Sequence, residues 1–393
     1  MTISLRGALI ALAVCLLGAA PAAASSSDTD CTGSYGGAAP HAGARIRFGI
    51  DPGIAGSAGG VQLPSVPDDP ARDRGAVKAL HPAARQLVVR LNRLFFSDGQ
   101  SGIAAFRAMA ARYTRAGFQV ELQVRYHPPQ GQAGDIAAWV AYVRYVVDSF
   151  GGNPRVVAMT ITNEVNVTFS PNTSDGYYAR AQDALIAGIE AARAEALRKR
   201  FRQLRFGFTY AYRFSPSQDA AFFSYLGAHG GRAFRRALGF VGLDFYPGTV
   251  YPPAMAPGAS YRGELAQAAG VVRNCFLPKA AIGARVPIWI TENGIPTGSM
   301  SESQQAAALS ELVRAANDYS RTFGITDYRW FNLRDSSENP AVALVPTTFS
   351  SFGLLHADYT AKPSFGAYRH LIASLGARTA AAHTRRPRRR GHR

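Results

Sequence analysis

The segment Val156-Val157-Ala158-Met159-Thr160-Ile161-Thr162-Asn163-Glu164 decides the fold. Its first seven residues are mostly apolar or β-branched and predict a buried strand, and an amide and a carboxyl group follow directly where that strand ends. An Ala-rich stretch of helical period, residues 177–200, comes next. A buried strand followed by such a helix is the repeating unit of α/β proteins, so this segment predicts one βα unit.

The same unit recurs along the chain. Eight strands are predicted, at residues 45–50, 87–94, 119–126, 156–162, 205–210, 240–245, 287–291 and 326–333. Helical stretches lie between them, among them residues 103–116, 136–150, 177–200, 219–225 and 303–323. This alternation predicts an α/β fold, a single (β/α)8 TIM barrel over residues 45–376. An open doubly wound sheet is the alternative, but the first strand has no Gly-x-Gly-x-x-Gly turn after it and the chain has no Walker loop.

Composition and charge narrow the classes of function. The 393 residues include 47% hydrophobic and 11% aromatic residues, enough for a large core, which excludes wholesale disorder. Lys and Arg number 43 against 26 Asp and Glu, a formal net charge of +17, which suggests nucleic acid, an anionic surface or an acidic substrate. Residues 377–393 hold seven arginines and no acid, so we expect a disordered basic tail that attaches to anionic surfaces.

The N-terminal residues resemble a secretory signal. Arg6 precedes an apolar run, and small residues follow it up to Ala24. We expect residues 1–24 to be a signal peptide that is cleaved after Ala24, and the mature chain to be secreted or extracytoplasmic with no transmembrane segment. A retained N-terminal anchor is the alternative.

A Ser/Gly-rich arm, residues 25–44, follows the signal and contains Cys31. After cleavage, Cys31 and Cys275 are the only two thiols of the chain. They can pair in an oxidising compartment, but two separate thiols remain open because the sequence does not give their separation.

Polar side chains close most of the predicted strands, and in a TIM barrel the catalytic groups lie at these ends. They are Asp51, Arg90, Asn92, His127, Asn163, Glu164, Tyr210, Tyr212, Asp244, Tyr246, Glu292, Asn293, Trp330, Asn332 and Asp335. Glu164 and Glu292 each follow a strongly apolar strand, the fourth and the seventh, which lie across the barrel from one another. A retaining glycosidase needs two carboxyls about 5 Å apart. A single Glu at a strand end is more often part of a salt bridge, but the pair at these two positions favours catalysis.

The motifs around both glutamates resemble those of one enzyme group. Ile161-Thr162-Asn163-Glu164 is similar to the Asn-Glu motif of clan A glycoside hydrolases, and Trp289-Ile290-Thr291-Glu292-Asn293-Gly294 is similar to the nucleophile segment of the same clan. The resemblance implies that Glu292 is the nucleophile and Glu164 the acid/base in double displacement on β-linked O-glycosidic bonds of an oligo- or polysaccharide. It also implies that no cofactor and no metal is needed.

Further positions resemble the family 5 pattern within this clan, and they imply a set of substrate-binding residues. In that pattern Arg90 supports the nucleophile, Tyr246 touches it, and Asn163 binds the sugar 2-hydroxyl. The expected substrate-binding set is Asn163, Tyr246, Trp330, His127, Arg90, Asp244 and Tyr212, with Trp330 and Tyr212 as stacking platforms for sugar rings. Asp244 departs from the pattern, because family 5 has His-x-Tyr where this chain reads Asp244-Phe245-Tyr246.

Two other functions remain open. One is a catalytically silent carbohydrate-binding TIM barrel, against which both glutamates count. The other is a nucleic-acid or anionic-polymer binder that acts through the arginine tail. The predicted barrel has no basic patch interleaved with aromatic residues, so we expect no specific binding of nucleic acid. We expect a monomer.

Overall fold

The fold is a closed barrel of eight parallel strands. The computed structural model describes residues 31–53, 57–58, 61–62, 65–171, 173–212, 216–250, 252–298, 300–337 and 350–379. Around the barrel the strands follow the order β1-β10-β9-β8-β7-β6-β5-β4. Their bounds are β1 Arg47–Ile50, β4 Leu87–Phe95, β5 Gln119–Arg125, β6 Val156–Ile161, β7 Arg205–Ala211, β8 Leu238–Phe245, β9 Ile288–Asn293 and β10 Ile325–Trp330. The predicted TIM barrel and its eight strands are confirmed, and the open sheet is wrong.

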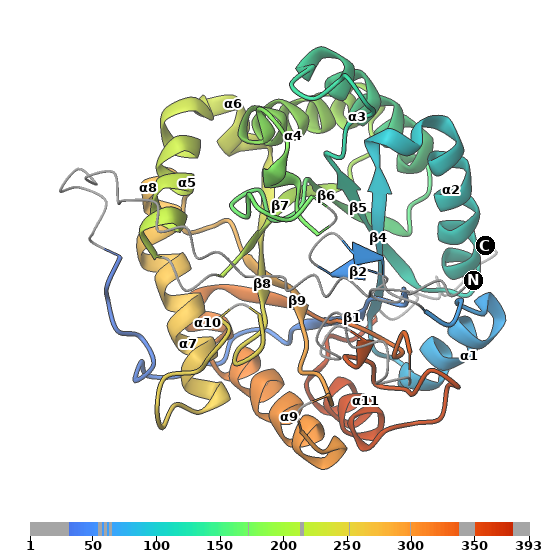
Figure 1. Ribbon diagram of the computed structural model, residues 1–393, viewed down its shortest axis with the longest axis vertical. Helices are drawn as coiled ribbons and strands as arrows, with labels where there is room; N and C mark the ends of the chain where they lie inside the picture. The colour runs from blue at the N-terminus through green and yellow to red at the C-terminus, as the bar shows by residue number, and fades with distance from the viewer. Residues whose placement is uncertain are drawn as a thin grey trace, which may run out of the picture.

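Helices surround the barrel (Figure 1). The longer ones are α1 Pro70–Leu80, α2 Gly99–Arg115, α3 Ile136–Gly151, α4 Ala181–Arg198, α5 Pro216–His229, α7 Tyr261–Val271, α9 Glu302–Asp318 and α11 Pro363–Leu375. Shorter elements are β2 Ser57–Ala58, β3 Val61–Gln62, η1 Phe96–Asp98, η2 Asp175–Tyr177, α6 Gly231–Ala237, η3 Val272–Phe276, α8 Leu277–Lys279 and α10 Ser320–Phe323. All five predicted helices are present, although the stretch 303–323 is divided into α9 and α10 at Tyr319.

Side chains alternate between the inside of the barrel and its helical layer, as the period of a strand requires. Inside, the rings of Phe240 and Trp289 stack with their centroids 3.7 Å apart. Another layer is ionic, because Glu121 of β5 lies 3.5 Å from Arg90 of β4 and 3.2 Å from Arg329 of β10. The interior is therefore filled, and the site can only lie at the carboxyl ends of the strands.

The N-terminal arm is fixed to the outside of the barrel. Cys31 forms a disulfide with Cys275 of η3, and their Cα atoms are 5.6 Å apart. The backbone N–H groups of Tyr35 and Gly36 donate to Oε1 of Gln267 in α7, at 2.6 and 3.2 Å. Figure 1 shows this blue segment running beside α7. The question left open by the sequence is therefore answered in favour of a disulfide.

The two ends of the sequence fall largely outside this description. The predicted signal peptide 1–24 and residues 380–393 of the basic tail lie outside the described residues. The start of the tail contacts the barrel, since Ala377 N–H donates to Ile46 O at 2.8 Å. Within the described ranges no helix is long and apolar enough to span a membrane.

Candidate active site

Three carboxyl groups meet at the carboxyl ends of the strands. They belong to Glu164, just after β6, Asp244 on β8 and Glu292 on β9, and their oxygen atoms can be chosen so that all lie within 4.8 Å of one another. All three side chains are buried. The barrel thus brings the two predicted catalytic glutamates together, at the separation that a retaining glycosidase uses.

Glu292 lies in surroundings that stabilise a negative charge. Tyr246 O–H donates to Oε2 at 2.8 Å, and Asn92 Nδ2 donates to Oε1 at 3.4 Å. The guanidinium of Arg90 lies 3.2 Å from Oε1 and is wholly buried. Burial raises the pKa of Tyr246 well above its ordinary value, so this phenol keeps its proton and remains a donor. These contacts place positive charge and hydrogen-bond donors against both carboxyl oxygens of Glu292.

Glu164 lies in the opposite kind of environment. Burial raises the pKa of its carboxyl well above the ordinary value, and the charges of Asp244 and Glu292 raise it further. The charges of Arg125 and Arg90 lower the pKa of Glu164, but by less than burial and the two acids raise it. A carboxyl that stays protonated at neutral pH can act as a general acid.

The backbone around Glu164 leaves the strand abruptly. Thr162 has a φ of +68° and Glu164 a φ of +45°, both in the left-handed region. The N–H of Glu164 donates to Thr209 Oγ1 at 3.2 Å. Backbone strain of this kind clusters at functional sites, where the surroundings hold it in place.

Asp244 belongs to the carboxyl cluster. Its Oδ1 accepts from Thr291 Oγ1 at 2.7 Å, whereas Oδ2 is buried and has no hydrogen-bond partner in the part of the chain that the structure describes. Burial raises the pKa of Asp244 well above its ordinary value, and Glu292 adds to this effect. Two neighbouring carboxyls, Glu164 and Asp244, therefore both favour the protonated form, and they are expected to titrate together.

Asn163 is engaged by the protein. Its Oδ1 accepts from Thr209 Oγ1 at 2.8 Å and from Gln123, and its Nδ2 donates to Thr173 O at 2.8 Å. These bonds fix the loop that carries Glu164. The predicted contact of Asn163 with a sugar 2-hydroxyl stays a prediction.

His127 lies toward the end of β4, with its contacts outside the carboxyl cluster. Its Nδ1 is 3.0 Å from Ser97 Oγ, and its ring packs against Phe95 and Tyr178. Burial lowers the pKa of the imidazole, which favours its neutral form. The described contacts join it to neither glutamate, so its predicted role in substrate binding is untested.

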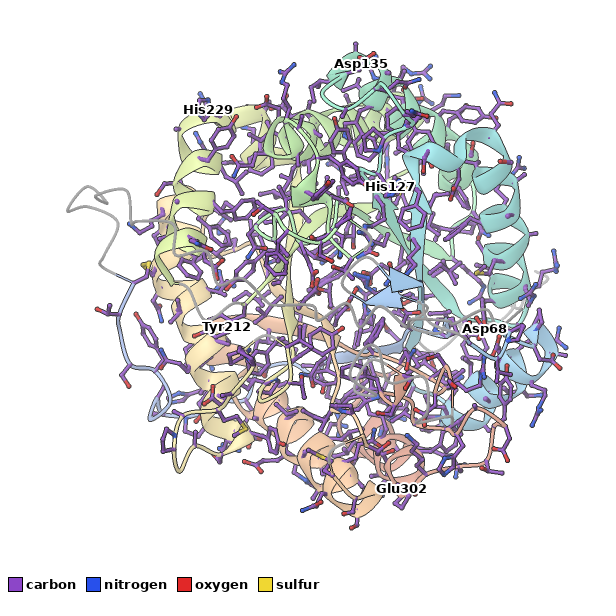
Figure 2. All side chains as sticks on the ribbon, viewed as in Figure 1. Asp68, His127, Asp135, Tyr212, His229 and Glu302 are labelled. Carbon is purple, nitrogen blue, oxygen red and sulfur yellow. A yellow bond between two sulfur atoms is a disulfide. The ribbon has the colours of Figure 1, made fainter. Side chains whose placement is uncertain are left out.

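Tyr212 packs against a neighbouring strand. Its ring packs on Phe245 with centroids 5.9 Å apart, and burial raises its pKa to about 12, with smaller effects from Glu264 of α7 and Asp219 of α5. Figure 2 shows Tyr212 close to α7, well away from His127. The expected stacking of Tyr212 on a sugar ring stays a prediction, since its described ring contact is with Phe245 of β8.

Trp330 is not a platform. Its side chain is 0% exposed, its ring packs against Tyr368 of α11, and its Nε1 donates to Phe352 O at 3.2 Å. The prediction fails because Trp330 occupies an outward position of β10. The inward position at this strand end is the next residue, Phe331, whose half-buried ring lies 6.0 Å from that of Tyr246. Phe331 was missed, although its period-two spacing from Asp327 and Arg329 indicates the inward face.

The carboxyl cluster is also the group most able to hold a metal ion. Among the described residues, Glu164, Asp244 and Glu292 are the one set of three potential ligands close enough together. The positive charge of Arg90, 3.2 Å from Glu292, opposes a cation there. The geometry is thus better suited to proton transfer and nucleophilic attack.

Comparisons with known proteins give the fold a context. A GH5_18 protein from Bifidobacterium longum subsp. infantis has a TM-score of 0.59 and 15% identity, over 86% of this chain and 81% of that one. A GH5_18 variant from Streptomyces cattleya has a TM-score of 0.58 and 16% identity, over 86% and 82%. A family 1 β-glucosidase from Thermotoga maritima has a TM-score of 0.57 and 14% identity, over 87% and 100%. The fold is that of clan A glycosidases.

This likeness concerns the fold alone, since the identities are low. No protein-family model and no curated protein matches the sequence. The roles of individual residues rest on the geometry described above.

Proposed function

We propose that this chain is a retaining glycoside hydrolase that cleaves O-glycosidic bonds by double displacement. One observation carries the proposal: the carboxyls of Glu164 and Glu292 lie within 4.8 Å of one another in opposite electrostatic surroundings. Arg90 and Tyr246 contact the carboxyl oxygens of Glu292, whereas burial and two neighbouring acids raise the pKa of Glu164. Pairs of carboxyls with such divided roles are what glycoside hydrolysis requires.

The first displacement forms a bond to the protein. A carboxylate oxygen of Glu292 attacks the anomeric carbon, and the bond between that carbon and the glycosidic oxygen breaks. Glu164 transfers its proton to the departing oxygen, so the leaving sugar departs as a neutral alcohol. The products of this step are a glycosyl ester on Glu292 and a carboxylate on Glu164.

The second displacement restores both groups. The Glu164 carboxylate takes a proton from water while the water oxygen attacks the anomeric carbon. The ester bond to Glu292 breaks, which returns its carboxylate to Arg90 and Tyr246. Configuration at the anomeric carbon is retained because it is inverted twice.

A β-linked sugar is the proposed substrate. The Streptomyces cattleya neighbour is in complex with Manb1-4GlcNAc, and the Thermotoga maritima neighbour is a β-glucosidase, and both names support a β-linkage. We further propose that the enzyme acts outside the cytoplasm. The signal-like residues 1–24 and the Cys31–Cys275 disulfide support that location, because disulfides persist in oxidising compartments.

Hydrolysis of aryl β-glycosides by purified protein tests the proposal. Glu292→Ala is expected to abolish turnover, and Glu164→Ala to lower it by about 10²–10⁴-fold. Azide is expected to restore part of the activity of the Glu164→Ala variant, because this anion can attack the anomeric carbon of the glycosyl ester without a general base, which releases Glu292 and forms a glycosyl azide. Glu190→Ala on α4, a half-buried glutamate away from the cluster, serves as the matched control. Unchanged turnover in either active-site variant would overturn the assignment, and saccharide binding without hydrolysis by the wild type would indicate a silent binding barrel.

A further inference from the structure

A cavity of about 380 Å³ opens beside Glu292. It lies between the ends of β1 and β4 on one side and helices α1 and α2 on the other. Its barrel-side wall includes Asp51, Asn92 and Phe331, and its outer wall includes Arg93 and Arg112. Arg90 and Asn92, which both contact Glu292, belong to its lining, whereas neither Glu292 nor Glu164 does. The cavity thus adjoins Glu292 through these two side chains.

The barrel-side wall presents acceptors without donors. Asp51 is 2% exposed, and its Oδ1 accepts from Gly53 N–H at 2.9 Å. Its Oδ2 and the Oδ1 of Asn92 are buried and have no hydrogen-bond partner among the described residues. A buried acceptor without a donor costs free energy, and the hydroxyl groups of a sugar would remove that cost.

Two arginines of this cavity have no direct ion pair. Arg93 is half-buried, and neither it nor Arg112 of α2 forms a hydrogen bond or an ion pair in the described part of the chain. Arg93 stands where β4 slips in register against β5, between Leu91 and Leu94, with a φ of +70°. Burial lowers the pKa of Arg93. A partly buried guanidinium without a counter-ion is stabilised when an anion binds.

The acids near this wall are already compensated. Asp68, which Figure 2 shows beside α1, forms an ion pair of 2.9 Å with Arg334. Asp73 accepts from Tyr359 O–H at 2.7 Å, and burial raises its pKa to about 6. Burial also raises the pKa of Asp51 to about 7. Among the described residues of the lining, Arg93 and Arg112 are therefore the cations without a direct ion pair or hydrogen bond.

We propose that this cavity binds the glycone of an acidic glycan, with Arg93 and Arg112 pairing with an anionic substituent and Asp51 accepting from a sugar hydroxyl. The anion is a carboxylate, as in a uronic acid, or a sulfate ester, because both oxyanions match a guanidinium. The formal net charge of +17 favours the same class, since a basic protein attracts acidic polymers over a distance. The position of the glycone rests on the proposed function, whereas anion binding rests on the cavity alone.

Calorimetric titration of the full chain with matched monosaccharides tests the proposal. The probes are glucose, galactose and mannose, their uronic acids and their 6-sulfates. In at least one series the anionic sugar is expected to bind about tenfold more tightly than the neutral one, which is the effect of one charge-assisted contact. Preference for the uronic acid identifies a carboxylate as the natural group, and preference for the 6-sulfate identifies a sulfate ester.

Two variants locate the binding. Arg93→Asn suits the left-handed backbone at this position, because Asn tolerates a positive φ. Arg112→Gln lies in a helix that tolerates Gln. Each is expected to lose about tenfold in affinity for the anionic sugar while affinity for the neutral sugar is kept. Arg107→Gln, an exposed position on the same helix outside this cavity, is the matched control.

The outcomes separate this proposal from the proposed function. Equal affinity for anionic and neutral sugars in every series, or anion binding that neither variant weakens, overturns the acidic-glycan site. If the protein hydrolyses neutral aryl glycosides and shows no preference for anionic sugars, the acidic-glycan site is wrong and the proposed glycosidase activity stands. If anionic sugars bind in a way that depends on Arg93 and Arg112 but no aryl glycoside is hydrolysed, the acidic-glycan site stands and the proposed glycosidase activity is wrong.

Discussion

The phenol of Tyr246 donates a hydrogen bond of 2.8 Å to Oε2 of Glu292. The two residues come from neighbouring strands, and the ring of Tyr246 is supported by Phe331 and Phe352. This support fixes the donor before any substrate arrives. Glu292 is thus oriented by packing as well as by charge.

Replacing Tyr246 by Phe removes this hydrogen bond and keeps the ring. A hydrogen bond to a charged group contributes about 1.5–3 kcal/mol, so kcat/KM is expected to fall by about 10–100-fold. Steady-state kinetics on an aryl β-glycoside measure the change, with Tyr145→Phe, an exposed tyrosine of α3, as the control. A Tyr246→Phe enzyme as active as the control would show that this bond does not support Glu292.

The variant Asp244→Asn is expected to move the pH dependence of activity. Glu164 has to be protonated for the first step, so its pKa sets the basic limb of the profile. The groups that face Asp244 and Glu164 are Glu292, Arg90 and Arg125, together with the hydroxyls of Thr209 and Thr291. Removing the acid at position 244 lowers the pKa of Glu164, and the basic limb is expected to move to lower pH. A basic limb at the wild-type pH would contradict the coupling of these two carboxyls.

The variant Arg90→Met is expected to lose stability and activity together. It removes the cation that lies 3.2 Å from Glu292 and 3.5 Å from Glu121, and of its ion pairs Glu121 keeps only the one with Arg329. Removing one partner of a buried ion pair costs about 3–5 kcal/mol. Urea unfolding measures the loss, and Arg90→Lys, which keeps the charge, is expected to recover part of it. An unchanged unfolding midpoint in Arg90→Met would rule out this structural role.

Two aromatic substitutions distinguish a residue of the cleft from a residue of the core. Phe331→Ala is expected to raise KM for an aryl glycoside, because this ring lines the cavity beside Glu292. Trp330→Phe is expected to lower the free energy of unfolding by about 1–3 kcal/mol, through lost packing and a lost hydrogen bond, and to leave KM unchanged. Kinetics and urea unfolding of both variants provide the comparison. The reverse pattern would place Trp330 in the cleft after all.

The variant Cys275→Ser is expected to lower Tm and to leave activity at room temperature intact. A disulfide contributes about 2–4 kcal/mol in most proteins, although the amount does not follow loop length closely. Thermal unfolding with and without a reducing agent measures the effect. The reducing agent is expected to lower Tm of the wild type and to leave that of the variant unchanged, and equal Tm values in all four samples would contradict the pairing.

The sequence predicts the barrel well because its strands are buried on both faces and stand out as apolar runs. The two glutamates are predicted for the same reason, since a carboxyl directly after such a run has to lie at the mouth of the barrel. Trp330 shows the limit of this reasoning. A shift of one residue along a strand moves a side chain from one face to the other, so an aromatic pair at positions 330 and 331 cannot be assigned without the register.

Other features depend on contacts between distant parts of the chain. Cys31 and Cys275 are 244 residues apart, and only the path of the arm along α7 brings them together. The half-buried position of Arg93 in the cavity wall coincides with a slip in the pairing of β4 with β5, which no local pattern indicates. Tyr212 follows its strand as the proposed site residues do, but its ring packs on Phe245.

The disulfide encloses most of the barrel strands in one covalent loop and leaves the last two strands outside it. The covalent loop from Cys31 to Cys275 contains β1 and β4 to β8, and therefore Glu164, while β9 with Glu292 and β10 lie beyond it. The barrel closes only when β9 docks on β8 and β10 pairs with β1. The proposed active site is therefore assembled from a cross-linked body and a free C-terminal segment. During refolding, catalytic activity would return only once β9 and β10 have docked. The rate at which turnover recovers would therefore measure the rate at which the barrel closes.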